Sequence, residues 1–314
     1  MGSGTHAQQT AQIISRFEPI LLEKKPDVVL VYGDVNSTVA AALVCAKLRI
    51  PIGHVEAGLR SFDRSMPEEI NRLLTDQVAD LLFTPSEDGD RNLLKEGVAA
   101  KKIHRVGNVM IDTLLQMLRA ARQSVPEDLP ERYILVTLHR PSNVDDPQWL
   151  MAMLETLSSV GHSVPVLFPV HPRTRQRLTQ SRWESYDGNG LRLMDPLPYI
   201  DFLGLQTRAS LVITDSGGIQ EETTFLGVPC LTVRTNTERP VTVEIGTNVL
   251  VGRDLETIRR ETATILAGKH KQGHVPPLWD GHAAERIAAV LTSCTEALLS
   301  PLVREFRVDK QRSG

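Results

Sequence analysis

Acidic and basic side chains follow short apolar segments in the first third of the chain. Asp34 comes directly after VVLVYG, Glu56 lies within PIGHVEAGLRS, and Glu68 and Arg72 lie within MPEEINR. Each has a simple structural explanation: Asp34 could shape a turn, and Glu68 could stabilise a helix N-terminus and pair with Arg72. Carboxylates at strand ends are nevertheless costly to desolvate, and open α/β sheets bind ligands at these ends. The group therefore predicts a ligand site that contains several acids.

Histidines and arginines occupy similar positions farther along the chain, from residue 139 onward. His139 and Arg140 follow ILVTL, His171 follows LFPV, and Arg239 lies in NTERP. His139 could also be a core histidine whose ring nitrogens are both satisfied. Together with the acids, these residues favour one site with several carboxylates, one or two histidines and an anion clamp.

The segment LVITDSGGIQEETTFLGVPCLTV contains a candidate phosphate site. It predicts a strand at Leu211–Thr214, and Ser216 is typical of a helix N-cap. Gly217 and Gly218 then leave backbone N–H groups uncovered at a helix N-terminus, where negative charge is favourable. This geometry could hold a diphosphate. A tight strand-to-helix turn, with Glu222 as an ordinary exposed helix residue, is the alternative.

Strand-like and helical segments alternate along nearly the whole chain. The expected strands are DVVLVYG, PIGHVEA, LLFTP, KIHRVG, YILVTLH, VPVLFPVH, LRLMDPLPY, Leu211–Thr214, Val228–Val233 and NVLVG. The expected helices are Thr10–Glu23, Ser37–Leu48, Glu68–Ala79, Glu87–Glu96, Val109–Arg122, Trp149–Leu157, one from Gly217 to near Gly227, Leu255–Leu266 and Ala283–Leu299. Because several strands are apolar on both faces, the pattern predicts parallel sheets covered by helices.

The expected architecture is α/β, with two Rossmann-like domains and an active site in the cleft between them. The polar, proline-bearing segment RQSVPEDLPER is the best candidate for the crossing between domains. We therefore expect a first domain at residues 1–118 and a second at 119–280. The last segment, 281–314, is expected to form a helix that packs back on the first domain.

The composition argues against several classes of protein. The chain has 314 residues and a net charge of −3, so no basic field favours nucleic acid or an anionic membrane. Its three cysteines fit buried thiols in a reducing compartment, not a disulfide framework or a metal cage. No apolar run approaches the ~20 residues of a membrane helix, and no signal peptide is evident. We expect a cytoplasmic globular protein.

Seven motifs give the chain a specific family resemblance. In chain order they are GSGTHAQQTA, VYGDVNSTVAAAL, GHVEAGLRS, MPEEINR, TLHRPSNVD, TDSGGIQEE and NTERPVTVEIGTN. The chain resembles the non-hydrolysing UDP-N-acetylglucosamine 2-epimerases, which are relatives of the two-domain GT-B glycosyltransferases. The resemblance spans essentially the whole chain and depends on no single motif.

The resemblance implies reversible conversion of UDP-N-acetylglucosamine to UDP-N-acetylmannosamine without a cofactor. UDP leaves C1 as the C2 proton is removed, giving a glycal, and adds back after reprotonation on the other face. It implies that Asp34, Glu56 and Glu68 are the catalytic acids and that Arg72 orients them. The choice of base among the three acids stays open. His139 would act beside the diphosphate.

The resemblance also implies how UDP is bound. Ser216, Gly217 and Gly218 would hold the diphosphate with Arg239. Glu222 would accept hydrogen bonds from the ribose, and Phe202 could pack near the uracil. Arg140 and His171 could form a site for an allosteric activator. Family members are dimers, so a homodimer is expected; a metal, nucleic acid and membrane are not.

The start of the chain departs from the family pattern. Family members begin with a strand ending in Gly-Thr-Arg-Pro-Glu and several dozen further residues, whereas this sequence opens MGSGTHAQQT. We therefore expect a fragment or a gene model that starts late, with an incomplete first domain, little activity and a tendency to self-associate. The alternative functions are a hydrolysing epimerase, a GT-B glycosyltransferase and a catalytically impaired UDP-sugar-binding fragment.

Overall fold

The computed structural model describes residues 4–178, 188 and 190–298. The chain divides into two compact units, the first made of residues 1–109 and 277–314 and the second of residues 110–276. The division lies at the start of helix α5 (Val109–Gln123), whereas the sequence placed it at residues 118/119. The polar segment expected to cross between domains lies inside the second unit, because Leu114 and Ala121 of α5 pack against Leu203 there.

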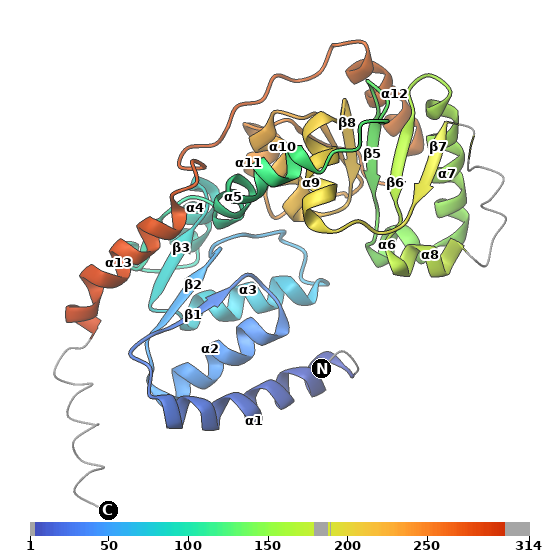
Figure 1. Cartoon of the computed structure of the whole chain (residues 1–314). Coiled ribbons are helices and arrows are strands. Elements are labelled where there is room, and N and C mark those ends of the chain that lie inside the picture. The colour runs from blue at the N-terminus through green and yellow to red at the C-terminus, as the bar shows by residue number, and fades with distance from the viewer. Residues whose placement is uncertain (1–3, 179–187, 189, 299–314) are drawn as a thin grey trace, which may run out of the picture. The chain divides into compact units, whose positions relative to one another are not determined.

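Within the described residues, the first unit contains a parallel sheet in the order β1-β2-β3-β4 (Figure 1). Its strands are β1 (Val29–Tyr32), β2 (Ile52–Val55), β3 (Leu81–Thr84) and β4 (Ile103–Arg105). Its helices are α1 (His6–Lys24), α2 (Asn36–Leu48), α3 (Pro67–Val78), α4 (Glu87–Lys95), η1 (Ala100–Lys102) and α13 (Ala283–Leu298). Leu299, the expected end of the last helix, lies outside the described residues.

Alternate residues of these strands enter two different cores. Ile52 and Leu82 pack in a cluster with residues of α1 and α2. Val55 and Phe83 pack in a second cluster that includes Ile287 of α13. Burial on both faces explains why β3 is apolar at every position except Thr84.

The part of the second unit that the structure describes contains a parallel sheet in the order β10-β9-β8-β5-β6-β7. Its strands are β5 (Ile134–Thr137), β6 (Val166–Pro169), β7 (Leu191–Met194), β8 (Leu211–Thr214), β9 (Cys230–Thr232) and β10 (Asn248–Leu250). Besides α5, its helices are α6 (Pro141–Val144), α7 (Pro147–Gly161), α8 (Pro172–Leu178), α9 (Tyr199–Arg208), α10 (Gly217–Leu226), α11 (Pro240–Glu244) and α12 (Leu255–Leu266). The two sheets confirm the predicted α/β class.

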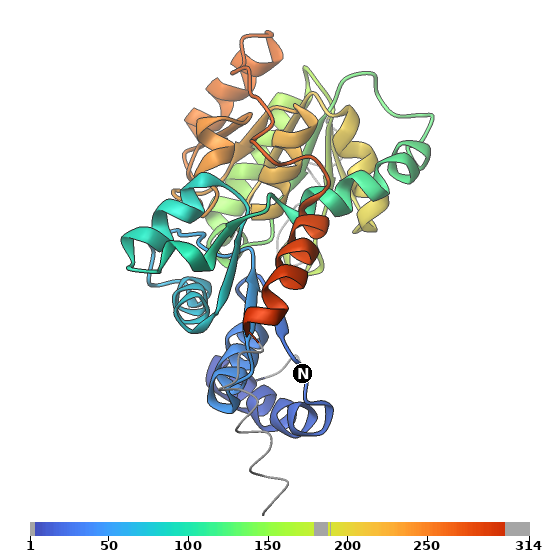
Figure 2. The same cartoon turned by 90° about the vertical axis from the view of Figure 1, so that its left-hand side faces the viewer.

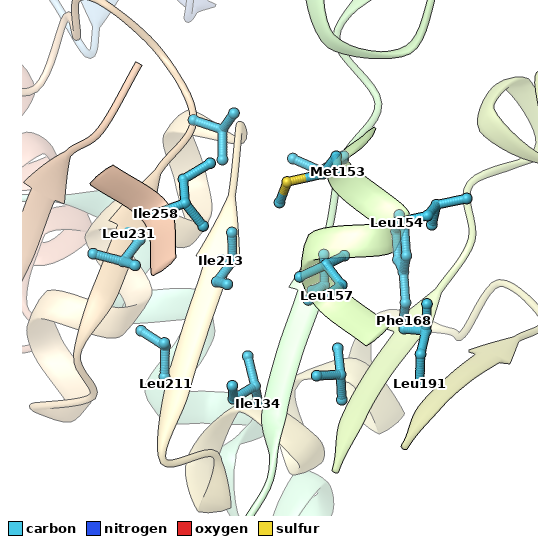
Figure 3. Close-up of a cluster of buried hydrophobic side chains, with 14 of the residues drawn as sticks. Ile134, Met153, Leu154, Leu157, Phe168, Leu191, Leu211, Ile213, Leu231 and Ile258 are labelled. Carbon is cyan, nitrogen blue, oxygen red and sulfur yellow. The ribbon is translucent and has the colours of Figure 1, made fainter. Parts of the chain in front are cut away.

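Helices cover both faces of the second sheet (Figures 1 and 2). Ile134 of β5 belongs to the cluster that packs against α7 and α12, where Met153 and Ile258 contribute (Figure 3). Leu135, the next residue, belongs to the cluster that includes Leu205 of α9 and Leu226 of α10. The strand is therefore buried on both sides.

The strand order creates a switch point between β5 and β8. The chain proceeds from β5 outward to β6 and β7, then returns to the other side of β5 for β8, β9 and β10. In open α/β sheets, ligands bind at the carboxyl ends of the strands beside such a point. His139 and Arg140 follow β5 there, and Asp215 and Ser216 follow β8.

Candidate active site

Asp34 and Arg72 form an ion pair at the carboxyl end of β1. The Nε and Nη2 groups of Arg72 donate to Oδ2 of Asp34 at 3.0 and 2.7 Å. Nη1 of Arg72 donates to Glu69, so the buried guanidinium joins two carboxylates. Arg72 is thus held by Asp34 and Glu69, and the pairing with Glu68 considered from the sequence is not the one observed.

Glu68 lies in the first turn of α3 and is half-buried. It lines a pocket of about 280 Å³ together with His6, Asn36 and Asn71. The side-chain amide of Asn71 donates to the backbone carbonyl of Asp34 at 2.8 Å. Glu68 therefore lies on the same helix as the residues that anchor Asp34.

Glu56 follows β2 with a φ of 72°, which is rare for a residue with a side chain. The backbone N–H groups of Glu56 and Ala57 both donate to the carbonyl of Phe83, at 3.1 and 3.0 Å, and hold this conformation. Oε2 of Glu56 lies 3.6 Å from the position that a Cβ on Gly33 would occupy. Strained backbone that its surroundings hold in place is typical of functional sites, and here it brings Glu56 beside the turn that precedes Asp34.

His139 is bound by Asp215 in the second unit. Its backbone N–H donates to both carboxylate oxygens, at 3.2 and 3.1 Å, and its Nδ1 lies 3.1 Å from Oδ1. Burial acts to raise the pKa of Asp215, but hydrogen bonds from His139, Asn143 and Arg140 outweigh it and lower the pKa. The His139 side chain remains 40% exposed, so it is not a core histidine.

His139 and His171 are brought together by the ends of β5 and β6. Their ring centroids lie 5.7 Å apart. Arg140 follows His139, and its Nη2 lies 3.9 Å from Oε1 of Glu238. His139 was predicted to act beside the diphosphate, and Arg140 and His171 to form an activator site. The structure places all three in one basic region of the second unit.

Ser216 is the N-cap residue of α10, as the sequence predicted. Its hydroxyl makes no capping hydrogen bond within the described part of the chain. A Cβ on Gly217 would lie 2.6 Å from Nη1 of Arg239 and 2.8 Å from Oε1 of Glu238. Glycine is therefore needed for a guanidinium to lie against this helix N-terminus. A cation beside uncovered backbone N–H groups is an arrangement that can bind phosphate.

Two buried carboxylates hold Arg239 in this position. Its Nε lies 3.0 Å from Oε1 of Glu221, and its Nη1 donates to Glu238. Glu238 also accepts from Arg234, at 2.6 Å. Glu221 and Arg234 were not among the predicted site residues; the only signal for them is their position in or beside GGIQEE and NTERP.

Glu222 is buried, 3% exposed, and not on the helix surface. Its Oε1 accepts a hydrogen bond from the Tyr199 hydroxyl at 2.8 Å. Burial raises the pKa of Glu222, against the hydrogen bond from Tyr199 that acts to lower it. Tyr199 begins α9, which also carries the half-buried Phe202. The sequence predicted Glu222 and Phe202 but overlooked α9, since no strong periodicity marks it.

Two helix-covered parallel sheets, with acids after strands of the first unit and basic groups after strands of the second, are typical of nucleotide-sugar enzymes with a GT-B-like fold. A family model described as UDP-N-acetylglucosamine 2-epimerase matches residues 1–292. The chain belongs to this family.

Individual relatives support the same assignment. The chain is 43% identical over 305 residues to a UDP-N-acetylglucosamine 2-epimerase of Methanocaldococcus jannaschii, covering 93% of this chain and 82% of the relative. A crystal structure of the epimerase from that organism, in complex with UDP-GlcNAc and UDP, superposes with a TM-score of 0.83 at 42% identity and covers 93% of this chain and 83% of that one. A UDP-2,3-diacetamido-2,3-dideoxy-D-glucuronate 2-epimerase of Pseudomonas aeruginosa is 44% identical, covering 92% of this chain and 81% of the relative.

Neither a metal-ion site nor a membrane-spanning helix is found among the described residues. Over residues 4–178, 188 and 190–298, no group of three or more His, Cys, Asp or Glu side chains is arranged to hold a metal ion. The helices in these ranges are also too short or too polar to cross a membrane.

Proposed function

We propose that this protein catalyses the reversible C2 epimerisation of UDP-N-acetylglucosamine to UDP-N-acetylmannosamine. A base removes the proton from C2 while the C1–O bond breaks and its electron pair leaves with UDP. The resulting glycal has a C1=C2 double bond. A proton then returns to the other face of C2, and the UDP oxygen forms the C1–O bond again. Atoms and electrons balance without an external oxidant or reductant.

The ion pair between Asp34 and Arg72, with the Glu56 carboxylate beside Gly33, is the observation that carries this proposal. The C2 proton is only weakly acidic, so its removal needs a positioned base and a second group that donates a proton. Asp34, Glu56 and Glu68 are the proposed acid/base set. Arg72 fixes the direction of the Asp34 carboxylate and offsets its charge.

The helix α10 N-terminus and Arg239 are proposed to stabilise the departing UDP. Negative charge builds up on the diphosphate as the C1–O bond breaks, and preorganised donors are most effective at this point. Ser216, Gly217, Gly218 and His139 complete the proposed diphosphate site.

The remaining groups of the second unit are assigned to the nucleoside and to regulation. Glu222 is proposed to accept from the ribose hydroxyls, and Phe202 to pack near the uracil. Arg140 and His171 are proposed as part of an activator site. A cytoplasmic homodimer remains a prediction.

A second substrate is favoured by one relative. The Pseudomonas aeruginosa epimerase named for UDP-2,3-diacetamido-2,3-dideoxy-D-glucuronate is as similar to this chain as the relatives named for UDP-N-acetylglucosamine. Inversion at C2 by elimination applies to both sugars, because each is named as a 2-epimerase substrate with an acetamido-type C2. The two candidates differ in the substituents at C3 and C6.

Incubation of the full chain with each UDP-sugar in deuterated water, followed by proton NMR, tests the proposal. We expect deuterium at C2 of the retained UDP-sugar and growth of the C2 epimer. Free N-acetylmannosamine with UDP would instead identify a hydrolysing enzyme, and product only with an added acceptor would identify a glycosyltransferase. The absence of C2 exchange with both sugars would contradict the proposal and favour the catalytically impaired UDP-sugar-binding alternative. Glu87→Gln, which changes a carboxylate that is 67% exposed, is the control variant.

A further inference from the structure

A series of ionisable groups, buried except for the partly exposed Glu96, links β2 to α3 close to the proposed acids. Nδ1 of His54, in β2, lies 2.6 Å from Oδ1 of Asp76, in α3, and neither side chain is exposed. Oδ2 of Asp76 accepts from Arg60 at 2.7 Å and from the Gly58 N–H at 3.1 Å. Arg60 in turn donates to Glu96 through Nε and Nη2, at 2.8 and 2.7 Å.

The contacts of His54 determine its protonation. Its Nε2 lies 2.9 Å from the carbonyl oxygen of Gly33, which can only accept, so Nε2 carries a proton. Asp76 already accepts from Arg60 and Gly58, so it is ionised and Nδ1 of His54 also carries a proton. The ring is therefore an imidazolium that donates from both nitrogens.

The charges around His54 favour this state. Burial acts to lower the pKa of His54, but the hydrogen bond and charge of Asp76 raise it, helped by the Gly33 carbonyl and the Glu56 carboxylate. Its neighbours across the sheet, Val31 in β1 and Leu82 in β3, are uncharged. The facing charges are thus Asp76 and Glu56, with Arg60 behind Asp76.

The hydrogen bond from His54 acts on the turn that carries Asp34. Gly33 has a φ of 61°, and its N–H donates to the carbonyl of Val55 at 3.1 Å. Its carbonyl accepts from His54. Both polar groups of Gly33 are therefore bound by residues of β2, immediately before Asp34 and beside the Glu56 carboxylate.

We propose that His54 is a positioning residue for the epimerase reaction. By donating to Gly33 on one side and Asp76 on the other, it fixes β1, β2 and α3 relative to one another and so sets the separation of Asp34 and Glu56. The role is distinct from catalysis, since no face of the ring is exposed. The inference rests on the proposed function, because it assigns Asp34 and Glu56 to proton transfer.

Two amide variants separate the two hydrogen bonds of His54. The amide nitrogen of Asn is placed like Nδ1, so His54→Asn can keep the bond to Asp76 and loses the bond to Gly33. The amide nitrogen of Gln is placed like Nε2, so His54→Gln can keep the bond to Gly33. Both variants remove the positive charge, and each keeps one of the two hydrogen bonds. Only His54→Gln keeps the bond to Gly33, in the turn that carries Asp34.

The assay is C2 deuterium exchange on the full chain, with kcat and KM determined separately. We expect His54→Asn to lower kcat by about 10- to 100-fold with little change in KM, the usual effect of losing a group that orients others. His54→Gln should recover a large part of this loss. His162→Gln, whose ring lies at the end of α7 and bonds to the Ser158 carbonyl, is the control and should be unaffected. Equal rates for His54→Asn and wild type, or equal losses for the two amides, would overturn the proposal.

Nitrogen-15 NMR of the wild-type histidines gives a readout that does not depend on variants folding. At about pH 8, well above the ordinary histidine pKa of ~6.5, His54 should still show two protonated ring nitrogens. One protonated nitrogen would overturn the proposal. If the wild type shows no C2 exchange, the proposed function fails. The NMR result still tests whether His54 donates hydrogen bonds to both Gly33 and Asp76.

Discussion

Asp215 binds His139 through both its backbone N–H and its imidazole ring, so one buried carboxylate fixes the residue and its side-chain direction. We predict that Asp215→Asn weakens UDP binding, because the amide offers one acceptor oxygen where the carboxylate now serves His139, Arg140 and Asn143. Loss of charged, buried hydrogen bonds costs about 1–3 kcal/mol, or roughly 5- to 150-fold in affinity. Calorimetric titration with UDP measures the change.

The control for this prediction is Glu256→Gln, a carboxylate-to-amide change on an 80% exposed side chain of the same unit. It should leave UDP affinity unchanged. An unaltered affinity in Asp215→Asn would show that the orientation of His139 does not matter for UDP.

The three proposed acids are predicted to act on the sugar and not on the nucleotide. Asp34→Asn, Glu56→Gln and Glu68→Gln should each lower C2 exchange, since a positioned acid or base contributes about 10²–10⁴-fold. UDP affinity should stay near that of the wild type, because all three residues belong to the first unit and the proposed UDP groups to the second. Near-normal exchange in any one variant would mark that residue as structural.

Much of the fold could be predicted from local patterns. The ten strands were located because buried parallel strands are apolar at nearly every position, as β3 and β8 are. Helices with weak or short patterns were not located from the sequence. The seven residues of α8, and α9, which follows two prolines, show no clear helical periodicity of apolar residues. The division between units was misplaced, because a polar segment indicates exposure but not which unit its flanking helix joins.

The proposed site residues that follow strands, such as Asp34, His139 and Ser216, could be selected from the sequence. Their supporting partners were harder to find. Tyr199 contacts Glu222 across 23 positions of sequence, and His54 contacts Asp76 across 22. Contacts of this kind depend on how helices pack on a sheet, and no spacing rule reveals them.

As the pH is lowered, the affinity for UDP is predicted to fall at a higher pH than it would if Glu222 titrated like an exposed glutamate. Glu222 must be ionised to accept hydrogen bonds from two ribose hydroxyls, and burial raises its pKa above the ordinary 4.5. Affinity is therefore present above the raised pKa and is lost as the pH falls through it. Because the Tyr199 hydroxyl acts to lower this pKa, Tyr199→Phe should move the loss to higher pH.

Calorimetric titrations with UDP across a pH series test this shift. Tyr133→Phe is the matched control, since the Tyr133 hydroxyl is also buried in the second unit but donates to the Leu205 carbonyl. Protonation of the UDP phosphates affects all the variants equally, so a difference between their pH midpoints reports on the protein. Identical pH midpoints for Tyr199→Phe and Tyr133→Phe would contradict the assignment of Glu222 to the ribose.

Gly217 and Gly218 are predicted to respond differently to the same substitution. In Gly217→Ala the new Cβ would lie 2.6 Å from the Arg239 guanidinium and 2.8 Å from Glu238, so the arginine must move away from the helix N-terminus. Both atoms end side chains, so we expect a cost near the lower end of the about 1–3 kcal/mol typical of overpacking. In Gly218→Ala the nearest atom is Cε of Met110 at 3.6 Å, an ordinary contact with a flexible side chain.

Thermal unfolding and calorimetric UDP titration of both variants give the comparison. Gly217→Ala should lower the melting temperature and weaken UDP binding by about 5-fold or more, as 1 kcal/mol corresponds to roughly that ratio. Gly218→Ala should unfold within a degree or so of the wild type or slightly above it, because alanine favours the helix over glycine by about 1 kcal/mol. If Gly217→Ala binds UDP as tightly as the wild type, then Arg239 does not need its position at the N-terminus of α10, and the proposed diphosphate site is wrong.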